Sequence, residues 1–217
     1  MRNIAPPIAL AALCGCGGFT DTGSGSGTLE VEVDTSYALE QNRTEVRVDV
    51  RVSSGDPASA GVVVRDDESG EVVELDVTLQ GVEAARYRGS FEGYRQRLEL
   101  EVERGNDELT ARLEGPGRHV IENPANGSVL SVSSDLDIEW SVEDGLSADA
   151  VTIELDDSGV DVTVSDDDGD FEVDEDSLEA GEETVSIERI NIIVLDGGLP
   201  GSSWEFSYEV ENDFVLE

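Results

Sequence analysis

Glu45-Val46-Arg47-Val48-Asp49-Val50-Arg51-Val52 decides the fold class, because a charged residue and a valine alternate along it. Successive side chains of a β-strand point to opposite faces, so this pattern gives one buried and one solvated face. The same period of two recurs at residues 29–33 and 98–103, and again at 136–142 and 151–155. Clusters of Gly, Asp and Pro separate these segments as turns. The sequence therefore predicts an all-β chain.

The spacing of these segments predicts two sandwiches. About seven short strands fall in each half of the chain, which is typical of immunoglobulin-like or fibronectin-III-like antiparallel β-sandwiches. We therefore predict two tandem sandwich domains, residues 28–118 and residues 119–217. In the second, the alternation slips by one between Ile187 and Ile190, which predicts a β-bulge near Glu188-Arg189. The apolar residues of 204–210 are expected to close that domain with an aromatic face.

The charge is strongly acidic and unevenly distributed. The chain has 51 acidic residues against 13 basic ones, and every basic residue is Arg. Residues 28–118 carry 21 acids and 11 Arg, a net of −10, whereas residues 119–217 carry 29 acids and one Arg, a net of −28. Such a balance argues against nucleic acid and against direct attraction to anionic lipid headgroups. Because acids follow almost every strand face, a saline habitat is favoured over cation binding as the cause.

A closer resemblance lies in the second half. It rests on Ile121-Glu122-Asn123-Pro124-Ala125-Asn126-Gly127, on Leu136-Asp137-Ile138-Glu139-Trp140-Ser141 and on Asp167-Asp168-Gly169-Asp170-Phe171. Together these motifs resemble the opening strands and the Asp-Asp-Gly hairpin of fibronectin-like domains in lipoproteins of myxobacteria and their relatives. The resemblance covers residues 119–217 and implies a sandwich with Trp140 as its core tryptophan, in an envelope location. It implies no activity.

The first residues indicate a lipoprotein signal peptide. Arg2 precedes an apolar run, Ile4–Leu13, and Leu13-Cys14-Gly15-Cys16 resembles the bacterial lipobox. Ten residues rise only ~15 Å as a helix, too little to span a bilayer, so the run is typical of a cleaved signal. We expect removal of residues 1–15 and a lipid membrane anchor on Cys16. The alternatives are an ordinary signal-peptidase site or a strained Cys14–Cys16 disulfide.

Residues 16–27 are rich in Gly and Ser. A tract of this composition behaves as a flexible coil, here reaching on the order of 20 Å, so we predict a tether between lipid and fold. Gly17, and not Asp, follows the lipidated Cys. In families with the well-described sorting rule this implies the outer membrane, on its periplasmic or its surface face.

The densest acidic run spans residues 166–176. Calcium takes six to eight oxygen ligands, and acids around a Gly turn can supply several of them. The candidate ligands for a weak calcium site are Asp166, Asp168, Asp170 and Glu175. However, the EF-hand spacing fails at its first position, Val164. A hairpin turn at Asp168-Gly169 is the favoured alternative.

Cationic and aromatic residues concentrate between residues 86 and 97. The candidate members of a partner surface are Arg86, Tyr87, Arg88, Tyr94, Arg95 and Arg97. Such a surface fits an anionic glycan or the acidic second domain. The favoured alternative follows from alternation alone, in which Tyr87 and Phe91 pack inward while the Arg side chains lie on a solvated strand face.

Catalytic motifs are absent from the sequence. There is no G-x-S-x-G, H-E-x-x-H, phosphate loop or dinucleotide fingerprint. His119, the sole histidine, is expected to be structural or merely exposed. We therefore predict a non-enzymatic lipoprotein of the cell envelope that acts as a structural or interaction module, with an envelope protein or glycan as partner. The alternative function is calcium-dependent adhesion or glycan binding at the cell surface. An enzyme would need a deep pocket with a buried carboxylate at the domain junction.

Overall fold

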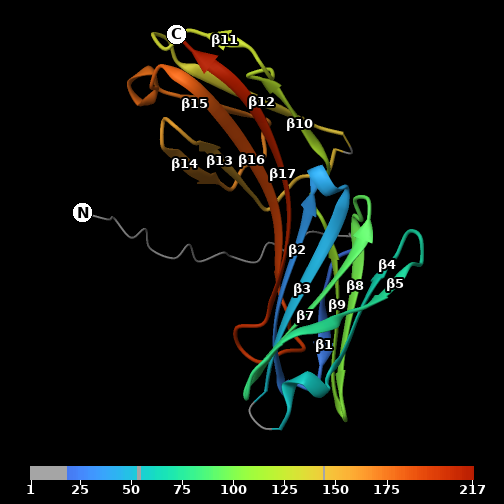
Figure 1. The fold of residues 1–217 in the computed structure, drawn as a ribbon. Helices are drawn as coiled ribbons and strands as arrows, with labels where there is room; N and C mark the ends of the chain where they lie inside the picture. Colours follow the sequence, from blue (N-terminus) through green and yellow to red (C-terminus); the bar gives the residue numbers. More distant parts are fainter. Residues whose placement is uncertain (1–18, 53–54, 144) are drawn as a thin grey trace.

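A computed structural model describes residues 19–52, 55–143 and 145–217, and these form an all-β structure (Figure 1). Most neighbouring strands are antiparallel, whereas β17 pairs in parallel with both β2 and β11. The predicted all-β sandwich class is confirmed. The signal peptide and Cys16 lie outside the described residues.

The described strands and short 3₁₀ turns follow in chain order: β1 (Asp21–Gly25), β2 (Leu29–Ala38), η1 (Leu39–Gln41), β3 (Arg43–Val52), η2 (Pro57–Ser59), β4 (Gly61–Asp66), β5 (Val72–Glu74), β6 (Asp76–Gln80), β7 (Ala84–Glu92), β8 (Arg97–Arg104), β9 (Asp107–Glu114), β10 (His119–Asn123), β11 (Val129–Leu130), β12 (Leu136–Val142), β13 (Ala150–Leu155), β14 (Val160–Val164), β15 (Asp170–Val173), η3 (Glu175–Ser177), β16 (Gly181–Val194) and β17 (Ser203–Leu216). The described residues contain no helix with the length and apolar character that a membrane crossing needs.

One nine-stranded sheet runs through the whole molecule. Its order is β14-β13-β16-β17-β2-β3-β7-β6, with β11 also paired to β17. At its centre, β16 and β17 form a hairpin whose 14 residue pairs run without a break from Gly181↔Leu216 to Val194↔Ser203. At ~3.3 Å per residue, each of these strands is ~46 Å long, which exceeds the length of one sandwich. The hairpin therefore extends along most of the molecule (Figure 1).

Two smaller sheets cover the same face of this large sheet. A five-stranded sheet has the order β1-β9-β8-β4-β5, and a three-stranded sheet has the order β10-β12-β15. On β17, Trp204 and Phe206 are buried with residues of β8 and β9, while Phe214 and Leu216 are buried with residues of β12. Because these four positions differ by even numbers, their side chains leave the same face of the strand. Each small sheet thus closes one core against the shared sheet.

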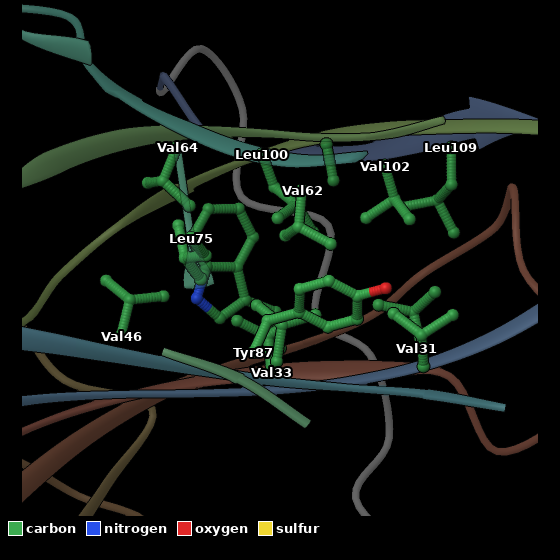
Figure 2. Close-up of a cluster of buried hydrophobic side chains, with 14 of the residues drawn as sticks. Val31, Val33, Val46, Val62, Val64, Leu75, Tyr87, Leu100, Val102 and Leu109 are labelled. Carbon is green, nitrogen blue, oxygen red and sulfur yellow. The ribbon is translucent and has the colours of Figure 1, made fainter. Parts of the chain in front are cut away.

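The first core lies under the five-stranded sheet. Figure 2 shows Val31, Val33 and Val46 on one side of it, Val62, Val64, Leu100 and Val102 on the other, and the Tyr87 ring between. The alternation that begins at residue 45 places Val46, Val48 and Val50 inward, all at most 1% exposed. The second core contains Ile138, Trp140, Val151, Ile153, Val185 and Ile187, so the expectation of Trp140 as a core tryptophan is confirmed.

The two cores do not divide the chain at one point. Leu195, Trp204 and Phe206 belong to the first core, although the sequence places them beyond residue 118. The expectation that Trp204 and Phe206 close the second sandwich is therefore wrong, whereas Val210 packs against the second core. A period of two tells which face of a strand is buried, but not which small sheet covers that face.

The predicted bulge near Glu188-Arg189 is also absent from the β16–β17 pairing, where Arg189 lies opposite Tyr208 in continuous register. Arg189 is fully buried at 0% exposure, in phase with Val185 and Ile187. The apparent slip arises because a charged residue occupies an inward position. Ile190 lies on the opposite face.

The tether prediction is wrong for residues 21–25, which form β1. This strand pairs with β9, with Asp21 opposite Arg112 and Gly25 opposite Leu109. A side chain at Gly23 would overlap the carbonyl oxygen of Thr110, so the close approach requires glycine there. The Gly/Ser composition therefore serves tight strand packing here and not flexibility.

Candidate functional site

Residues 115–119 cross the middle of the β16–β17 hairpin, and we call this region the junction. A buried ion pair lies there. The Nε of Arg189 donates to both carboxylate oxygens of Asp167, at 3.2 and 3.1 Å, and Nη2 also contacts Oδ2. The Arg189 side chain is 0% exposed and the Asp167 side chain 3%. Two charges are thus removed from water together, which proteins tolerate only when further hydrogen bonds satisfy them.

Four more hydrogen bonds satisfy this pair. Arg189 donates to the carbonyl oxygens of Gly117 and Leu146. Asp167 accepts from the indole Nε1 of Trp140 at 3.0 Å and from the backbone N–H of Ala148 at 2.8 Å. The partners come from the junction, from the segment before β13 and from β12. The pair therefore ties several separate segments to β16.

The carboxylate of Asp167 is ionised. Burial by itself would raise its pKa, but hydrogen bonds from Arg189, Ala148 and Trp140 hold the pKa below its ordinary value. A carboxylate held in this way is a poor proton donor or acceptor near neutral pH. The buried carboxylate that an enzyme at the junction would need is present, yet its charge is already neutralised by Arg189.

His119 is buried beside this pair, as its expected structural role requires. It is 1% exposed, its Nε2 lies 3.1 Å from the Ile187 carbonyl oxygen, and its Nδ1 has no hydrogen-bond partner among the described residues. Burial, and then the positive charge of Arg189, lower the pKa of His119 to about 4. The imidazole is therefore neutral at pH 7.

An aromatic cluster adjoins His119 on the side of the first core. The rings of Tyr37 and Tyr208 stack with centroids 5.2 Å apart, and Tyr94 meets both edge-on at 5.5 and 5.2 Å. The ring of His119 lies 5.3 Å from Tyr208. The hydroxyl of Tyr94 donates to the carbonyl oxygen of Pro116. These contacts fix residues 115–119 against the first core.

The acidic run 166–176 does not form one cluster. Asp166 and Asp168 are exposed on either side of the buried Asp167, Asp170 opens β15 opposite Glu139, and Glu175 lies in a 3₁₀ turn. In residues 19–52, 55–143 and 145–217, no three His, Cys, Asp or Glu side chains are grouped so that they could hold a metal ion. Calcium binding therefore stays a prediction without a preformed ligand set.

The expected hairpin at Asp168-Gly169 is wrong. β14 pairs with β13 in the large sheet, whereas β15 pairs with β12 in the three-stranded sheet. The turn is thus a crossover between two sheets. It brings Asp167 over the junction, where Arg189 lies.

The residues of the predicted Arg/Tyr surface are separated. Tyr87 is 1% exposed in the first core and its hydroxyl donates to the Pro57 carbonyl oxygen, so simple alternation predicts its place. Arg88 is exposed. The other Arg residues are ion-paired: Arg86 with Asp49 at 2.9 Å, Arg95 with Glu71 at 2.9 Å and Arg97 with Glu114 at 2.8 Å. Tyr94 lies in the aromatic cluster. These six side chains do not form one continuous surface.

Carboxylates crowd the outer face of the large sheet. We call this surface, formed by Asp34, Glu188, Glu205 and Glu209, the acidic face. Glu188 lies directly opposite Glu209, and Glu205 lies opposite Asp34. Burial raises the pKa of Glu188 and of Glu205. Neighbouring carboxylates raise both pKa values further, while a hydrogen bond with Ser207 opposes the rise at Glu188. Like charges opposite each other destabilise a sheet, so salt or a cationic partner would relieve this face.

Two shallow grooves lie on the outer faces of the sheets. One of about 480 Å³ crosses β1, β9, β8 and β4, where Ser24, Arg65, Glu99 and Arg112 line it. Another of about 340 Å³ crosses β2, β3 and β7 beside the acidic face. Neither is lined by Asp167 or His119. The buried charged residues therefore do not open into these grooves.

Sequence reasoning missed Arg189 as the central residue of the junction. Its signal was available, because Arg189 is the single basic residue among 29 acids in residues 119–217. It also stands two residues after Ile187, in phase with the buried Val185 and Ile187. A lone cation in phase with a core indicates a buried ion pair more directly than a bulge does.

The comparisons with known proteins add little to this description. No protein-family model and no curated protein matches the chain. Among solved structures, the chain is similar to the fibronectin(III)-like modules of Clostridium thermocellum CbhA, with a TM-score of 0.29 and 11% identity over 86% of this chain and 94% of that one.

Proposed function

We propose that the chain is a non-enzymatic structural or interaction module of the cell envelope, held to the outer membrane by a lipid on Cys16. The observation that carries the proposal is the β16–β17 hairpin, which contributes to both cores and so holds two sandwiches in one fixed arrangement. Such a body can present its outer sheet faces and strand edges at a set spacing. An envelope protein or a glycan is the partner that this role requires.

The buried groups support a structural role. Arg189 and Asp167 use their hydrogen bonds on each other and on the backbone of the junction, and His119 packs between Ile187 and Tyr208. Side chains whose hydrogen bonds are used within the protein hold the junction segments together and have none left for a substrate. What a partner meets is the exterior, above all the acidic face and the two grooves.

Membrane fractionation tests the anchor. Wild-type protein expressed in a bacterial host is expected in the membrane fraction, with a lipid on its N-terminal Cys16 by mass spectrometry. Cys16→Ser is expected to release it, while Cys14→Ser, the matched control in the signal peptide, should change nothing. Membrane attachment of Cys16→Ser would overturn the anchor.

The rigidity of the body has its own test. Spin labels at two exposed positions, one beside each core, should give a single narrow distance distribution. Glu101→Cys and Glu172→Cys are suitable sites, since both residues are exposed on strands. A broad or bimodal distribution would contradict the shared hairpin as a fixed connection.

A further inference from the structure

Phe19 fixes the start of the described chain to the outer face of the five-stranded sheet. Its ring lies beneath two guanidinium groups, with Cζ of Arg97 at 5.9 Å and Cζ of Arg112 at 5.7 Å from the ring centroid. Both Arg residues point outward, because the inward positions of β8 and β9 are the apolar ones. Cation–π contacts of this kind favour an ordered ring.

The residues after Phe19 are fixed as well. The hydroxyl oxygen of Thr20 accepts from the backbone N–H of Glu114 at 3.1 Å. Thr22 donates to the Asp196 carboxylate at 2.6 Å and its carbonyl oxygen accepts from the Asp196 N–H at 3.0 Å. β1 is therefore bound on one side to β9 and on the other to the turn between β16 and β17.

This attachment limits how far Cys16 can lie from the fold. Cys16 precedes Phe19 by three residues, and three extended residues span at most ~11 Å. A free coil from Cys16 to residue 27 would instead reach on the order of 20 Å. The chain leaves the fold toward Cys16 at Thr20, which lies beside Glu114. This position is directly before the junction and not at either end of the molecule.

We infer that the outer face of the five-stranded sheet lies against the surface of a phospholipid bilayer, so that the body is attached side-on by its middle. The inference rests on the proposed lipid at Cys16. A chain of three residues leaves no room for the body to stand off the membrane or to turn its acidic face toward it. The large sheet then faces away from the lipid.

The charges around Phe19 suit this placement. Arg112 and Arg65 both pair with Glu99, and Arg97 pairs with Glu114 at 2.8 Å. These pairs balance the charges next to the ring, although Glu101, Glu103 and Glu108 are exposed on the same two strands. On the acidic face, Glu188 and Glu209 lie directly opposite each other. A surface of paired charges can approach zwitterionic headgroups without the repulsion that an acidic surface meets.

Energy transfer from the protein to the membrane tests the orientation. The lipidated protein is reconstituted into phosphatidylcholine vesicles that contain an acceptor-labelled lipid, with a donor on Glu101→Cys or on Glu45→Cys. Residue 101 lies on the outer face of the five-stranded sheet and residue 45 on that of the large sheet, and both are exposed. The lipidated Cys16 has no free thiol and takes no label.

Transfer from position 101 should be at least about twofold stronger, because the two sheets are ~10 Å apart and transfer falls steeply with distance. Gly23→Ala with Gly25→Ala should abolish the difference, since added methyl groups would overlap backbone oxygens of Thr110, Gly197 and Glu108 and detach β1. Gly61→Ala is the control and should preserve the difference, because the nearest atom to an added methyl group there is the Glu103 carbonyl oxygen at 4.0 Å.

Equal transfer from the two positions of a protein that carries the lipid would overturn the side-on orientation and leave the anchor intact. A purified mature protein without lipid on Cys16 would overturn both. Stronger transfer from position 45 would place the acidic face on the membrane and would contradict the inference directly.

Discussion

Asp167→Asn removes the counter-charge of Arg189 while it changes the size of the side chain very little. Arg189 would keep its bonds to the carbonyl oxygens of Gly117 and Leu146 but would have no ionised partner, at 0% exposure. An uncompensated buried charge is costly because the interior solvates it far less well than water does. The substitution therefore tests whether the ion pair holds the junction together.

The expected loss follows from this burial. Breaking a buried pair by removing one partner costs about 3–5 kcal/mol. That is a large part of the ~5–15 kcal/mol that stabilises a typical protein. Asp170→Asn is the matched control, because Asp170 is exposed only three residues away and should change stability by less than about 0.5 kcal/mol.

Urea unfolding at fixed ionic strength measures the effect. Trp140 reports on the second core and Trp204 on the first, so Trp204→Phe leaves fluorescence that follows the second core alone. With an m-value of about 1–3 kcal/mol per M, the midpoint should fall by more than about 1 M. A loss below about 1 kcal/mol for Asp167→Asn would refute the reasoning, since the pair would then contribute no more than a surface contact.

Three further outcomes are expected. His119 binds a proton near pH 6.5 in the unfolded chain but only near pH 4 in the folded protein. Its contribution to the free energy of unfolding is therefore complete above pH 6.5, and about 3 kcal/mol of it is lost as the pH falls toward 4. His119→Gln should flatten the pH dependence of the urea midpoint. Gly115→Val should lower the Tm, because a Cβ there would lie 2.5 Å from Cε1 of Phe206. The expected loss of stability is about 1–3 kcal/mol, and an unchanged Tm would contradict this close packing. Millimolar calcium in low salt should leave the Tm unchanged; a rise that Asp168→Ala abolishes would establish the calcium-dependent alternative instead.

Alternation along the chain was sufficient for the strands and for the inward residues of each. Val46, Val48 and Val50 are buried as their pattern predicts, and so are Leu98, Leu100 and Val102. This succeeds because a strand's two faces are decided locally, by which side chains are apolar. The sequence of charges and valines carries that information residue by residue.

The partner of each face is not decided locally, and here the prediction fails. Trp204 and Phe214 lie on the same face of one strand, yet they belong to different cores. Nothing within residues 203–216 marks the point where one small sheet ends and the next begins. That point depends on where residues 115–119 cross the hairpin, which is a long-range property of the chain.

Composition misled in two places for a common reason. The Gly/Ser composition of residues 16–27 predicts flexibility, and the acidic run 166–176 offers calcium ligands without singling out Asp167. In each case the structure uses the residue for a close or buried contact, since Gly23 packs on Thr110 and Asp167 pairs with Arg189. Composition describes the average surroundings of a residue type, whereas these sites depend on one neighbour.

The burial of Arg189 has a consequence for the whole surface. It is the single cation of residues 119–217, so this half presents no positive side chain to solvent. In residues 28–118, by contrast, Arg51 on the large sheet and Arg65 and Arg97 on the five-stranded sheet pair with neighbouring acids. Because the shared hairpin contributes residues to both cores, we expect the two halves to keep one relative orientation. The molecule therefore carries its charge asymmetry in a fixed direction along its length, and a cationic partner would be attracted to the end formed by the second core.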